Sequence, residues 1–327
     1  MRVLVTGAAG RLGEALVRIL RRAGHDVVGL DVLASEHVTR VGSIVDRAWV
    51  REAMARVETV FHAATLHKPH VATHTRQDFV DTNVTGTLNL LEEASAAGVE
   101  RFIFTSTTSV FGDALSPPPG APAAWITEDV VAVPKNIYGV TKAAAEDLCQ
   151  LFHRNQRLAC LVLRTSRFFP EEDDDSAVRQ AWPDDNLKVN EYLHRRVDIE
   201  DVVSAHLLAA ERAPAIGFGK YIISATTPFQ PGDVGGLAVD AAAVVRRRVP
   251  AYEAEYERRG WRMFPGIGRV YINDRARRDL GWRPLHDFPS IIARLQAGGE
   301  VASALAREIG SKGYHGAAFV EGPYPVE

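Results

Sequence analysis

A phenol and an ammonium group stand four residues apart near the middle of the chain, at Tyr138 and Lys142. Residues with this spacing lie on one face of a helix, one turn apart. A tyrosine with its ordinary pKa of about 10 is a poor base at neutral pH, but a neighbouring cation favours the phenolate. The pair therefore predicts proton transfer with a bound substrate. An ordinary helix turn is the alternative interpretation of the same spacing.

A row of hydroxyl groups precedes this pair, in the segment Thr105-Ser106-Thr107-Thr108-Ser109. The row follows an apolar run that is typical of a buried strand. From the end of that strand, Ser106 or Thr107 could hydrogen-bond a substrate oxygen while Tyr138 takes its proton. The alternative is that these hydroxyls only cap the end of the strand.

The elements that must position these groups begin with the first thirteen residues, MRVLVTGAAGRLG. An apolar strand is followed by three glycines, Gly7, Gly10 and Gly13, and then by apolar residues at helical spacing. Strand, glycine turn and helix in this order are typical of a dinucleotide-binding site, because the backbone N–H groups can approach a pyrophosphate. In this turn we expect cofactor contacts from Gly7, Ala9, Gly10, Arg11 and Leu12.

A second predicted strand, from Asp26 to Leu30, is followed by Asp31. An acidic side chain at this place accepts hydrogen bonds from the adenosine ribose and repels a 2′-phosphate, which favours NAD over NADP. Two alternatives stay open. Asp31 alone is also compatible with a solvated loop, and Arg11 in the glycine turn could tolerate a phosphate.

Composition excludes several classes of protein. The chain has 327 residues, 46% of them hydrophobic, and a formal net charge of −3. Lys and Arg are scattered, no apolar run approaches the roughly 20 residues of a membrane span, and the N-terminus leads directly into a strand. Cys149 and Cys160 have no metal-ligand spacing. We therefore expect a cytoplasmic protein with no metal, no nucleic-acid partner and no membrane association.

Strands and helices alternate over the first 165 residues. The predicted strands are 3–5, 26–30, 38–41, 58–63, 101–106 and 158–163, and the predicted helices are 14–20, 46–56, 83–97 and 137–154. This order predicts an α/β fold, a Rossmann-type doubly wound parallel sheet with a smaller mixed C-terminal substrate lobe. Residues 168–192 read as irregular and acidic, 197–212 as a helix, 221–224 as a strand, and the chain from 228 onward as helix and loop.

After residue 165 the regular alternation of strands and helices gives way to an irregular, acidic sequence, which predicts two domains. The NAD-binding domain would comprise 1–165 and about 198–225. The substrate-binding lobe would comprise about 166–197 and 226–327.

A series of motifs occurs along the chain in a fixed order: TGAAGRLG, Asp31, VFHAA (60–64), NVTGT (83–87), TSTTSVFG (105–112), YGVTK (138–142), RRVDIEDVVSAH (195–206) and RARRDLGWRP (275–284). In these motifs the chain resembles an extended short-chain dehydrogenase/reductase. Within that superfamily it is similar to the NAD-dependent epimerase/dehydratase group, which includes UDP-glucose 4-epimerase. The similarity extends over essentially the whole chain.

The resemblance implies roles for particular residues. Tyr138 would be the catalytic base, Thr107 the catalytic Ser/Thr, and Lys142 would hold the nicotinamide ribose and depress the tyrosine pKa. The cofactor NAD would also be contacted by Ser43 and Ile44 at the adenine, by Ala63 and Ala64 along its path, and by His62, Asn83 and Thr105. Asn83 occupies the position of the family's structural asparagine. Two helices, 83–97 and 137–154, pair into a dimer interface in related proteins, which implies a homodimer.

Departures from the family pattern bear on the substrate. Thr108 and Ser109 stand where the dehydratases have an acidic pair, so a dehydratase is not expected. Ser43 replaces a more usual aspartate. The segment from Arg164 to Asp175 is similar to uronate dehydrogenases, and its five carboxylates, Glu171 to Asp175, would be unfavourable beside a diphosphate. A solvated surface loop is the alternative interpretation of this segment.

These observations favour reversible hydride transfer at a secondary alcohol of a sugar-like substrate, nucleotide sugars included, with an epimerase preferred. The alternatives are a net sugar or uronate dehydrogenase and an NAD-binding regulator without turnover. Two further clusters stay open. His67, His70 and His74 could contact substrate or, less expected, a metal ion, and the arginines between Arg246 and Arg262 could meet a diphosphate or only coat a helix.

Overall fold

A seven-stranded parallel sheet organises the computed structural model, which describes residues 1–173 and 175–312. The strand order is β3-β2-β1-β4-β5-β7-β8, and every neighbouring pair is parallel. The strands are β1 (Arg2–Thr6), β2 (Asp26–Asp31), β3 (Arg40–Val41), β4 (Thr59–His62), β5 (Arg101–Thr107), β7 (Ala159–Thr165) and β8 (Phe218–Ile223). The predicted doubly wound parallel sheet is confirmed.

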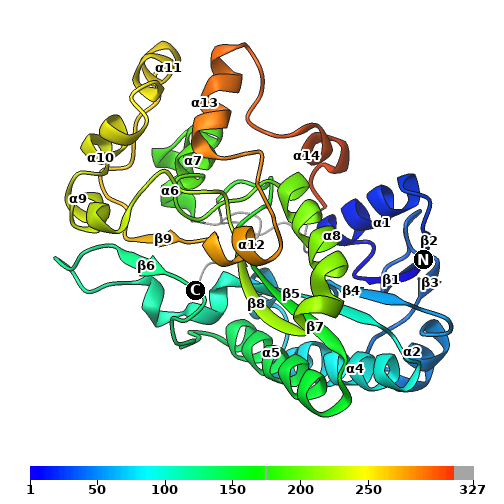
Figure 1. The fold of residues 1–327 in the computed structure, drawn as a ribbon. Helices are drawn as coiled ribbons and strands as arrows, with labels where there is room; N and C mark the ends of the chain where they lie inside the picture. Colours follow the sequence, from blue (N-terminus) through cyan, green and yellow to red (C-terminus); the bar gives the residue numbers. More distant parts are fainter. Residues whose placement is uncertain (174, 313–327) are drawn as a thin grey trace.

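Helices cover both faces of this sheet (Figure 1). Val3 and Val5 pack with α1 (Arg11–Arg22) and α8 (Ile199–Ile216), whereas Leu4, on the opposite face of β1, packs with the helices of the other layer. That layer contains α2 (Arg47–Ala53), α4 (Gly86–Ala96) and α5 (Ile137–Gln156). Because both faces are buried, the strands are continuously apolar.

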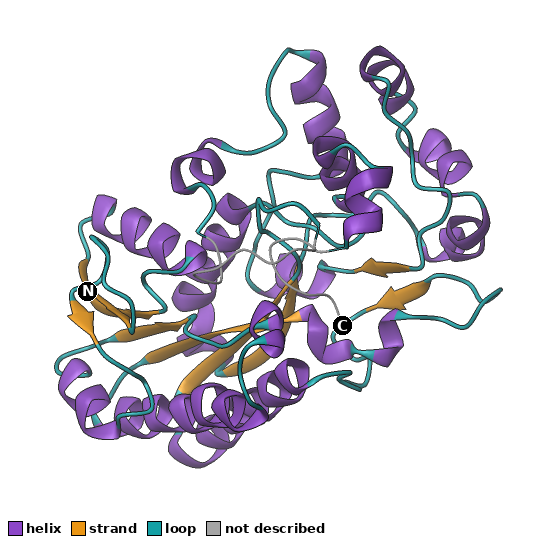
Figure 2. Cartoon of the chain, turned by 180° about the vertical axis from the view of Figure 1, so that it is seen from behind, coloured by secondary structure: helices purple, strands orange, loops and turns teal. Residues whose placement is uncertain are grey.

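A second group of elements lies above the carboxyl edge of the sheet, as the view from behind also shows (Figure 2). Its helices are α6 (Ser176–Ala181), α7 (Asp184–Glu191), α9 (Val234–Val239), α10 (Ala241–Arg248), α11 (Tyr252–Arg259) and α13 (Phe288–Gln296). Two short parallel strands, β6 (Ala124–Ile126) and β9 (Arg269–Tyr271), form a separate sheet. Most of these elements share one hydrophobic cluster, which includes Leu237 and Phe288.

Two C-terminal elements pack on the first lobe instead. They are α12 (Asp274–Asp279) and α14 (Ala304–Ile309), whose Ala276 and Leu305 belong to the cluster that contains α1 and α8. The predicted division into 1–165 with 198–225 and 166–197 with 226–327 stays a prediction. Both α12 and α14 belong to the second of these pieces by sequence but pack on the first.

Several local predictions differ from the structure. The helix expected from residue 83 starts earlier, with α3 (Arg76–Phe79) and a π-helical stretch, Val80–Thr85, leading into α4. Thr75 is the N-cap residue of α3. Its side chain accepts from Asp78 N, and the Asp78 side chain accepts from Thr75 N, which forms a capping box. The segment 168–192 is not simply irregular, because it contains α6 and α7. Their starts are marked by acidic residues: Asp175 caps α6, and Asp184 lies in the first turn of α7.

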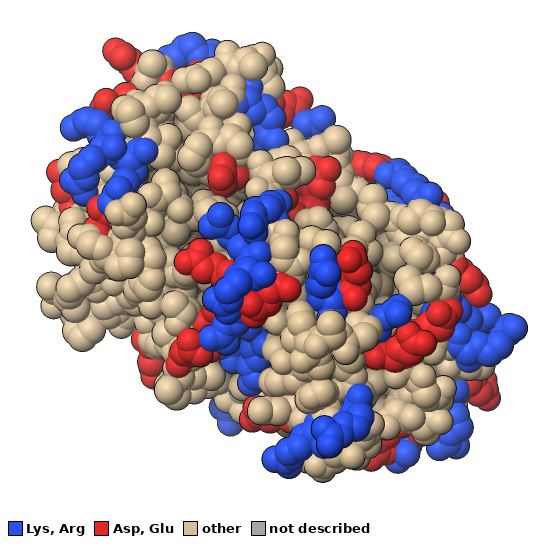
Figure 3. Space-filling model, viewed as in Figure 1, with Lys and Arg blue, Asp and Glu red and all other residues tan. Residues whose placement is uncertain are grey.

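On the face drawn in Figure 3, Lys and Arg side chains are interspersed with Asp and Glu. Many of them form ion pairs, such as Arg275 with Asp129 at 2.7 Å. Among the described residues no helix is both long and apolar enough to cross a membrane. Cys149 and Cys160 are free thiols buried in the core.

Candidate functional site

One cavity of about 620 Å³ runs along the carboxyl edge of the sheet. It is lined by the turns that follow β1, β2, β4, β5 and β7, as expected for a doubly wound sheet. The structure brings most of the predicted site residues to this cavity, namely Gly7, Ala9, Gly10, Arg11, Leu12, Asp31, Ser43, Ile44, Ala63, Ala64, Thr105, Thr107 and Tyr138. Three predicted residues, His62, Asn83 and Lys142, lie behind its wall.

The turn after β1 depends on the absence of side chains at two glycines. Gly7 has a φ of +74°, and a Cβ atom there would lie 2.8 Å from Ala64 N. A Cβ atom at Gly13 would lie 1.9 Å from Gly7 O, so only glycine lets α1 start this close to the turn. Gly10 is the N-cap residue of α1 and has no side chain to accept from the first backbone N–H groups of the helix. These N–H groups are therefore available to bind an anion. This cradle fits the pyrophosphate of a dinucleotide.

Asp31 is held at the end of β2 by two backbone donors. Its Oδ2 accepts from Ala9 N and its Oδ1 from Leu33 N, both at 3.0 Å. The carboxylate therefore stands beside the glycine turn, where it suits a ribose and opposes a 2′-phosphate. The Arg11 guanidinium donates to Gly310 O and, at 3.3 Å, to Ala306 O, so it is engaged by the C-terminal end of α14.

Tyr138 lies in the first turn of α5. Asn136 caps this helix by accepting from Gly139 N at 3.0 Å, and a Cβ atom at Gly139 would lie 3.0 Å from Ser109 O. The close approach of these segments brings the phenol to the end of β5. Burial raises the pKa of Tyr138 to about 12, and a hydrogen bond with Thr107 opposes the rise. Both members of the predicted pair, Tyr138 and Thr107, line the cavity.

Lys142 does not reach the cavity surface. Its Nζ donates to Thr105 O at 2.6 Å and lies 3.9 Å from the centre of the Phe104 ring. Burial lowers the pKa of Lys142 to about 7. Burial has the largest effect on the Tyr138 pKa, and the depression expected from this ammonium stays a prediction.

Thr105 is also positioned by a histidine that the sequence analysis did not single out. His206 Nδ1 is 2.8 Å from Val202 O, and its Nε2 is 2.8 Å from Thr105 Oγ1. Since the carbonyl can only accept, Nδ1 carries the proton and Thr105 donates to Nε2. Burial lowers the pKa of His206 to about 4, so the ring is neutral. The motif RRVDIEDVVSAH contains this histidine, but its partner is 101 residues away.

His62 and Asn83 build the wall of the cavity from behind. The His62 ring lies between Thr6 Oγ1, at 2.8 Å, and Thr87 Oγ1, at 2.9 Å, and burial lowers its pKa well below its ordinary value. Asn83 Oδ1 accepts from Leu66 N at 2.8 Å, and its Nδ2 donates to Thr141 Oγ1 at 3.0 Å. Both side chains are thus committed within the protein and fix the segment after β4.

A buried ionic network supports the hydroxyl row on its other side. Glu146, on α5, accepts from Ser106 Oγ at 2.6 Å and from Arg164 Nη2 at 2.7 Å, and lies 3.1 Å from Lys220 Nζ. Although burial would raise the pKa of Glu146, Arg164 and Lys220 hold it below its ordinary value. The network joins α5, β5, β7 and β8 directly beneath the site.

The far end of the cavity is lined by aromatic and charged side chains. The His67 ring centre is 6.5 Å from that of Tyr138 and 5.7 Å from that of Phe169, on which it stacks. His70 also lines the cavity, whereas His74 is exposed. Arginines are contributed by the turn after β7, the segment before α8, and β9.

The acidic segment is not simply a solvated loop. Asp173 is buried and accepts from Arg167 Nη1 at 2.6 Å. Glu171 lines the cavity and accepts from Ser311 Oγ at 2.6 Å. Asp174, a member of the predicted acidic run, lies outside the described residues.

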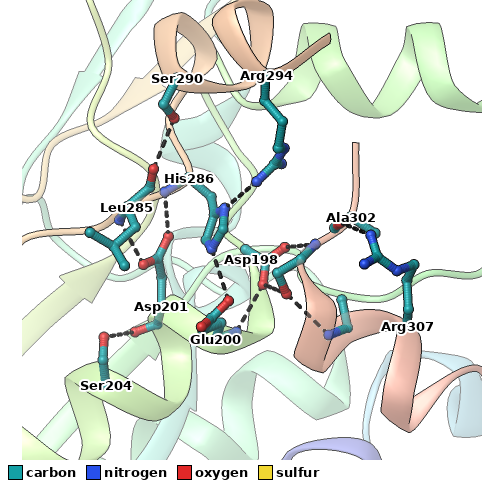
Figure 4. Close-up of polar contacts among 12 residues, drawn as sticks. Asp198, Glu200, Asp201, Ser204, Leu285, His286, Ser290, Arg294, Ala302 and Arg307 are labelled. Atoms are coloured by element: carbon teal, nitrogen blue, oxygen red, sulfur yellow. Dashed lines mark hydrogen bonds and ion pairs between the residues drawn. The ribbon is translucent and has the colours of Figure 1, made fainter. Parts of the chain in front are cut away.

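A group with possible metal ligands lies at the start of α8 (Figure 4). Oxygen and nitrogen atoms of Asp198, Glu200 and His286 lie within 4.8 Å of one another. Arg294 Nη1 is 2.8 Å from His286 Nδ1, so this nitrogen accepts, and Nε2 faces Glu200 Oε2 at 3.1 Å as the donor. Asp198 accepts from Ser303 N and Oγ. These atoms are hydrogen-bonded to one another and to the C-terminal segment. The group therefore serves as a structural joint, a set of hydrogen bonds that fastens the start of α8 to residues 285–303.

The site and the fold agree with the similarities of the chain. Residues 3–223 match the model of the NAD dependent epimerase/dehydratase family. A UDP-glucose 4-epimerase of Erwinia amylovora is 32% identical over 182 residues, which are 50% of this chain and 52% of that protein. A UDP-glucose 4-epimerase of Corynebacterium glutamicum is 27% identical over 329 residues, 89% of this chain and 94% of that protein.

A solved structure extends the similarity to the whole fold. A short-chain dehydrogenase/reductase superfamily protein from Agrobacterium tumefaciens, crystallised with bound NAD, superposes with a TM-score of 0.63 at 25% sequence identity. The match covers 94% of this chain and 99% of that one.

Proposed function

Because the chain belongs to the NAD dependent epimerase/dehydratase family and is thus an NAD-dependent enzyme, we propose that it moves a hydride reversibly at a secondary alcohol of a sugar-like substrate. The observation that carries this proposal is that Tyr138 and Thr107 line the same cavity as the glycine turn. One continuous space therefore holds a dinucleotide cradle and a proton-transfer pair.

Bound NAD supplies the hydride acceptor and donor of this chemistry. Thr107 holds the substrate oxygen by a hydrogen bond, and Tyr138 moves its proton. With its pKa at about 12, the phenol is protonated at neutral pH and is ready to donate to a carbonyl oxygen. To accept a proton it needs a positive charge nearby, which lowers its pKa. Lys142 orients the end of β5 through Thr105 O.

We propose an epimerase as the first candidate and a net dehydrogenase as the second. The first is supported by the similarity to UDP-glucose 4-epimerases. The second is favoured by Glu171, a carboxylate that lines the cavity and would repel a diphosphate there. Both use Tyr138 and Thr107, and they differ in whether the ketone is reduced again before it leaves.

The proposal is tested first with Tyr138→Phe. This variant keeps the ring and loses the proton that the reaction needs, so turnover should be abolished while the affinity for NAD stays nearly unchanged. Turnover is measured with nucleotide sugars and with free aldoses and uronates, and NAD binding by fluorescence titration. A Phe variant that keeps most of its rate would show that another group moves the proton.

Analysis of the cofactor that leaves the denatured protein separates the two candidates. NAD released in near-stoichiometric amount would favour an epimerase, which regenerates its cofactor in each cycle. A protein that is purified empty and reduces added NAD in the presence of an aldose or a uronate would favour a dehydrogenase. Released NADP would contradict the role of Asp31.

A further inference from the structure

The last described residues lie beside the glycine turn. Residues 303–312, which we call the C-terminal strap, comprise Ser303, α14 and the three residues that follow this helix. Arg11, the first residue of α1, donates to Gly310 O of the strap. Ser311 Oγ donates to Glu171 at 2.6 Å. Since Arg11 and Glu171 both line the cavity, the strap is fastened to two segments of its wall.

Lys312, at the end of the strap, brings a positive charge to the cavity. It lines the same space as the glycine turn, and its ammonium group forms an ion pair with Glu14. Glu14 stands in the first turn of α1, where its backbone N–H donates to Gly10 O at 2.9 Å. The Lys312 ammonium therefore lies beside the helix N-terminus that fits a pyrophosphate.

Glu14 is a carboxylate that opposes an anion at this place. Its side chain is only 4% exposed. Although burial would raise it, hydrogen bonds with Lys312 and Arg18 hold the pKa of Glu14 below its ordinary value. The carboxylate is therefore ionised at neutral pH and repels a phosphate bound at the glycine turn unless a cation balances it.

Arg18 alone cannot balance this charge, because three carboxylates share its guanidinium group. They are Glu14 at 2.8 Å, Glu308 at 3.1 Å and Glu36 at 3.4 Å. Arg22 also pairs with Glu308, so two arginines face three acids. The ring of His37 is 3.4 Å from Glu14 and adds a charge only when it is protonated. Lys312 supplies the third cation of this group.

The other charges in the cavity wall come from different segments. The cations that line the cavity are Arg11, Lys68, Arg167, Arg195, Arg269 and Lys312, and the carboxylates are Asp31 and Glu171. Asp31 accepts from Ala9 N in the turn, whereas Arg11 donates to carbonyl groups of the strap. A pyrophosphate at the turn adds negative charge beside Asp31 and Glu14, and Lys312 is placed to compensate for it.

We propose that Lys312 binds the pyrophosphate of NAD, together with the backbone N–H groups of the glycine turn. An ammonium group has three donors, so it can hold Glu14 and a phosphate oxygen at the same time. The affinity for the cofactor then depends on the C-terminal strap as well as on the turn after β1. The strap, through Ser311 and Glu171, also ties this cofactor contact to the segment after β7.

The exchange of bound NAD against an excess of isotope-labelled NAD tests this role. Lys312→Met should speed the exchange at least about ten-fold, because a charged hydrogen bond to the phosphate is lost. Lys312→Arg keeps the charge and should stay close to the wild type. Lys135→Met is the matched control and should leave the exchange unchanged, since it removes an exposed lysine that pairs with Asp113, at 3.3 Å, in the loop before α5.

Displacement of bound NAD separates phosphate binding from a purely structural role of the strap. Adenosine has no phosphate, so it should displace NAD from Lys312→Met at an about ten-fold lower concentration than from the wild type. ADP-ribose contains the pyrophosphate and loses the same contact as NAD, so the concentration it needs should not change. A strap that only shaped the site would weaken all three ligands alike, and adenosine would then need the same concentration in both proteins.

Glu14→Gln distinguishes a phosphate ligand from an anchor of the strap. It removes the repelling charge and leaves the ammonium to the phosphate, so NAD should exchange no faster than in the wild type. If Lys312 only fastened the strap to α1, Glu14→Gln would speed the exchange as much as Lys312→Met does. That result, or an unchanged exchange in Lys312→Met, would overturn the role of Lys312. Because none of these measurements needs turnover, a failure of the proposed hydride transfer would not alter them.

Discussion

At the scale of single residues, the site depends on the absence of Cβ atoms at the glycines of the turn after β1 as much as on the side chains that line it. Gly13→Ala would place a methyl group 1.9 Å from Gly7 O, and no rotamer relieves this contact because the backbone fixes the position of the Cβ atom. We expect it to cost about 3 kcal/mol of stability and most of the NAD affinity. Gly10→Ala, with a contact of 3.2 Å in the same turn, is the control and should lose about 1 kcal/mol or less. Equal losses of stability in urea unfolding of the two variants would contradict this expectation, and NAD titration of Gly13→Ala measures the loss of affinity.

Lys142 makes stability depend on pH. Its pKa of about 7 in the folded protein lies below its ordinary value of 10.5, so between these values the unfolded chain binds a proton that the folded chain does not. The free energy of unfolding therefore rises with pH across this window. Relative to Lys142→Met, the wild type should gain up to about 1.4 kcal/mol per pH unit. Urea unfolding without NAD at about pH 7, 8 and 9 measures the difference, which should be constant if Lys142 does not titrate.

Residue types alone predict which groups could do chemistry, but they do not predict the hydrogen-bond partners and burial of those groups. The Tyr138–Lys142 spacing predicted their common helix correctly, yet it did not show that Lys142 turns away to Thr105 O. His206 and Glu146 act on Thr105 and Ser106 from other elements. Contacts between distant segments depend on the packing of the sheet, which residue spacing does not contain.

At the scale of elements, the start of α8 is joined to the C-terminal segment. Asp198 caps the helix through Glu200 N and accepts from Ser303, and Asp201 accepts from Leu285 N and His286 N (Figure 4). Asp198→Ala leaves these donors without an acceptor and should cost about 1–3 kcal/mol. Glu200→Gln, which can still accept from His286, is the control with a much smaller effect. Thermal unfolding of both variants tests the joint.

The same joint yields a prediction about metals. Because the polar atoms of Asp198, Glu200 and His286 are already hydrogen-bonded, adding EDTA should change neither the melting temperature nor the activity. A shift of the melting temperature with EDTA, reversed by Zn²⁺, would show that an ion occupies the group.

Elements with strong local signals were predicted well, and those without them were not. The apolar strands, and helices such as α5, follow the sequence pattern within a few residues. The three-residue strands β6 and β9 carry no periodicity and exist because they pair with each other across the second lobe. Arg269 and Tyr271 reach the cavity through that pairing, so their place in its wall could not be inferred from the sequence.

At the scale of the whole molecule, α4 and α5 lie side by side on the outer surface of the first lobe (Figure 1). Along α5, Val140, Ala144, Leu148 and Leu151 form an apolar stripe at helical spacing that is only partly covered. We propose that this surface pairs with a second copy of the chain. Val140, 49% exposed, should then be covered, so Val140→Glu should shift sedimentation towards a monomer. Val239→Glu, at a position 83% exposed outside these helices, is the control, and a wild type that sediments as a monomer would contradict the proposal.

The contacts of Arg11 with α14 have a consequence for protein synthesis. The ribosome makes Arg11 and Glu14 long before it makes their partners, Ala306, Gly310 and Lys312. A growing chain that has completed every strand of the sheet still lacks the helix that holds the first turn in place. We therefore expect a chain stalled before residue 304 to form its sheet but to retain NAD poorly, so that cofactor capture comes at the end of translation.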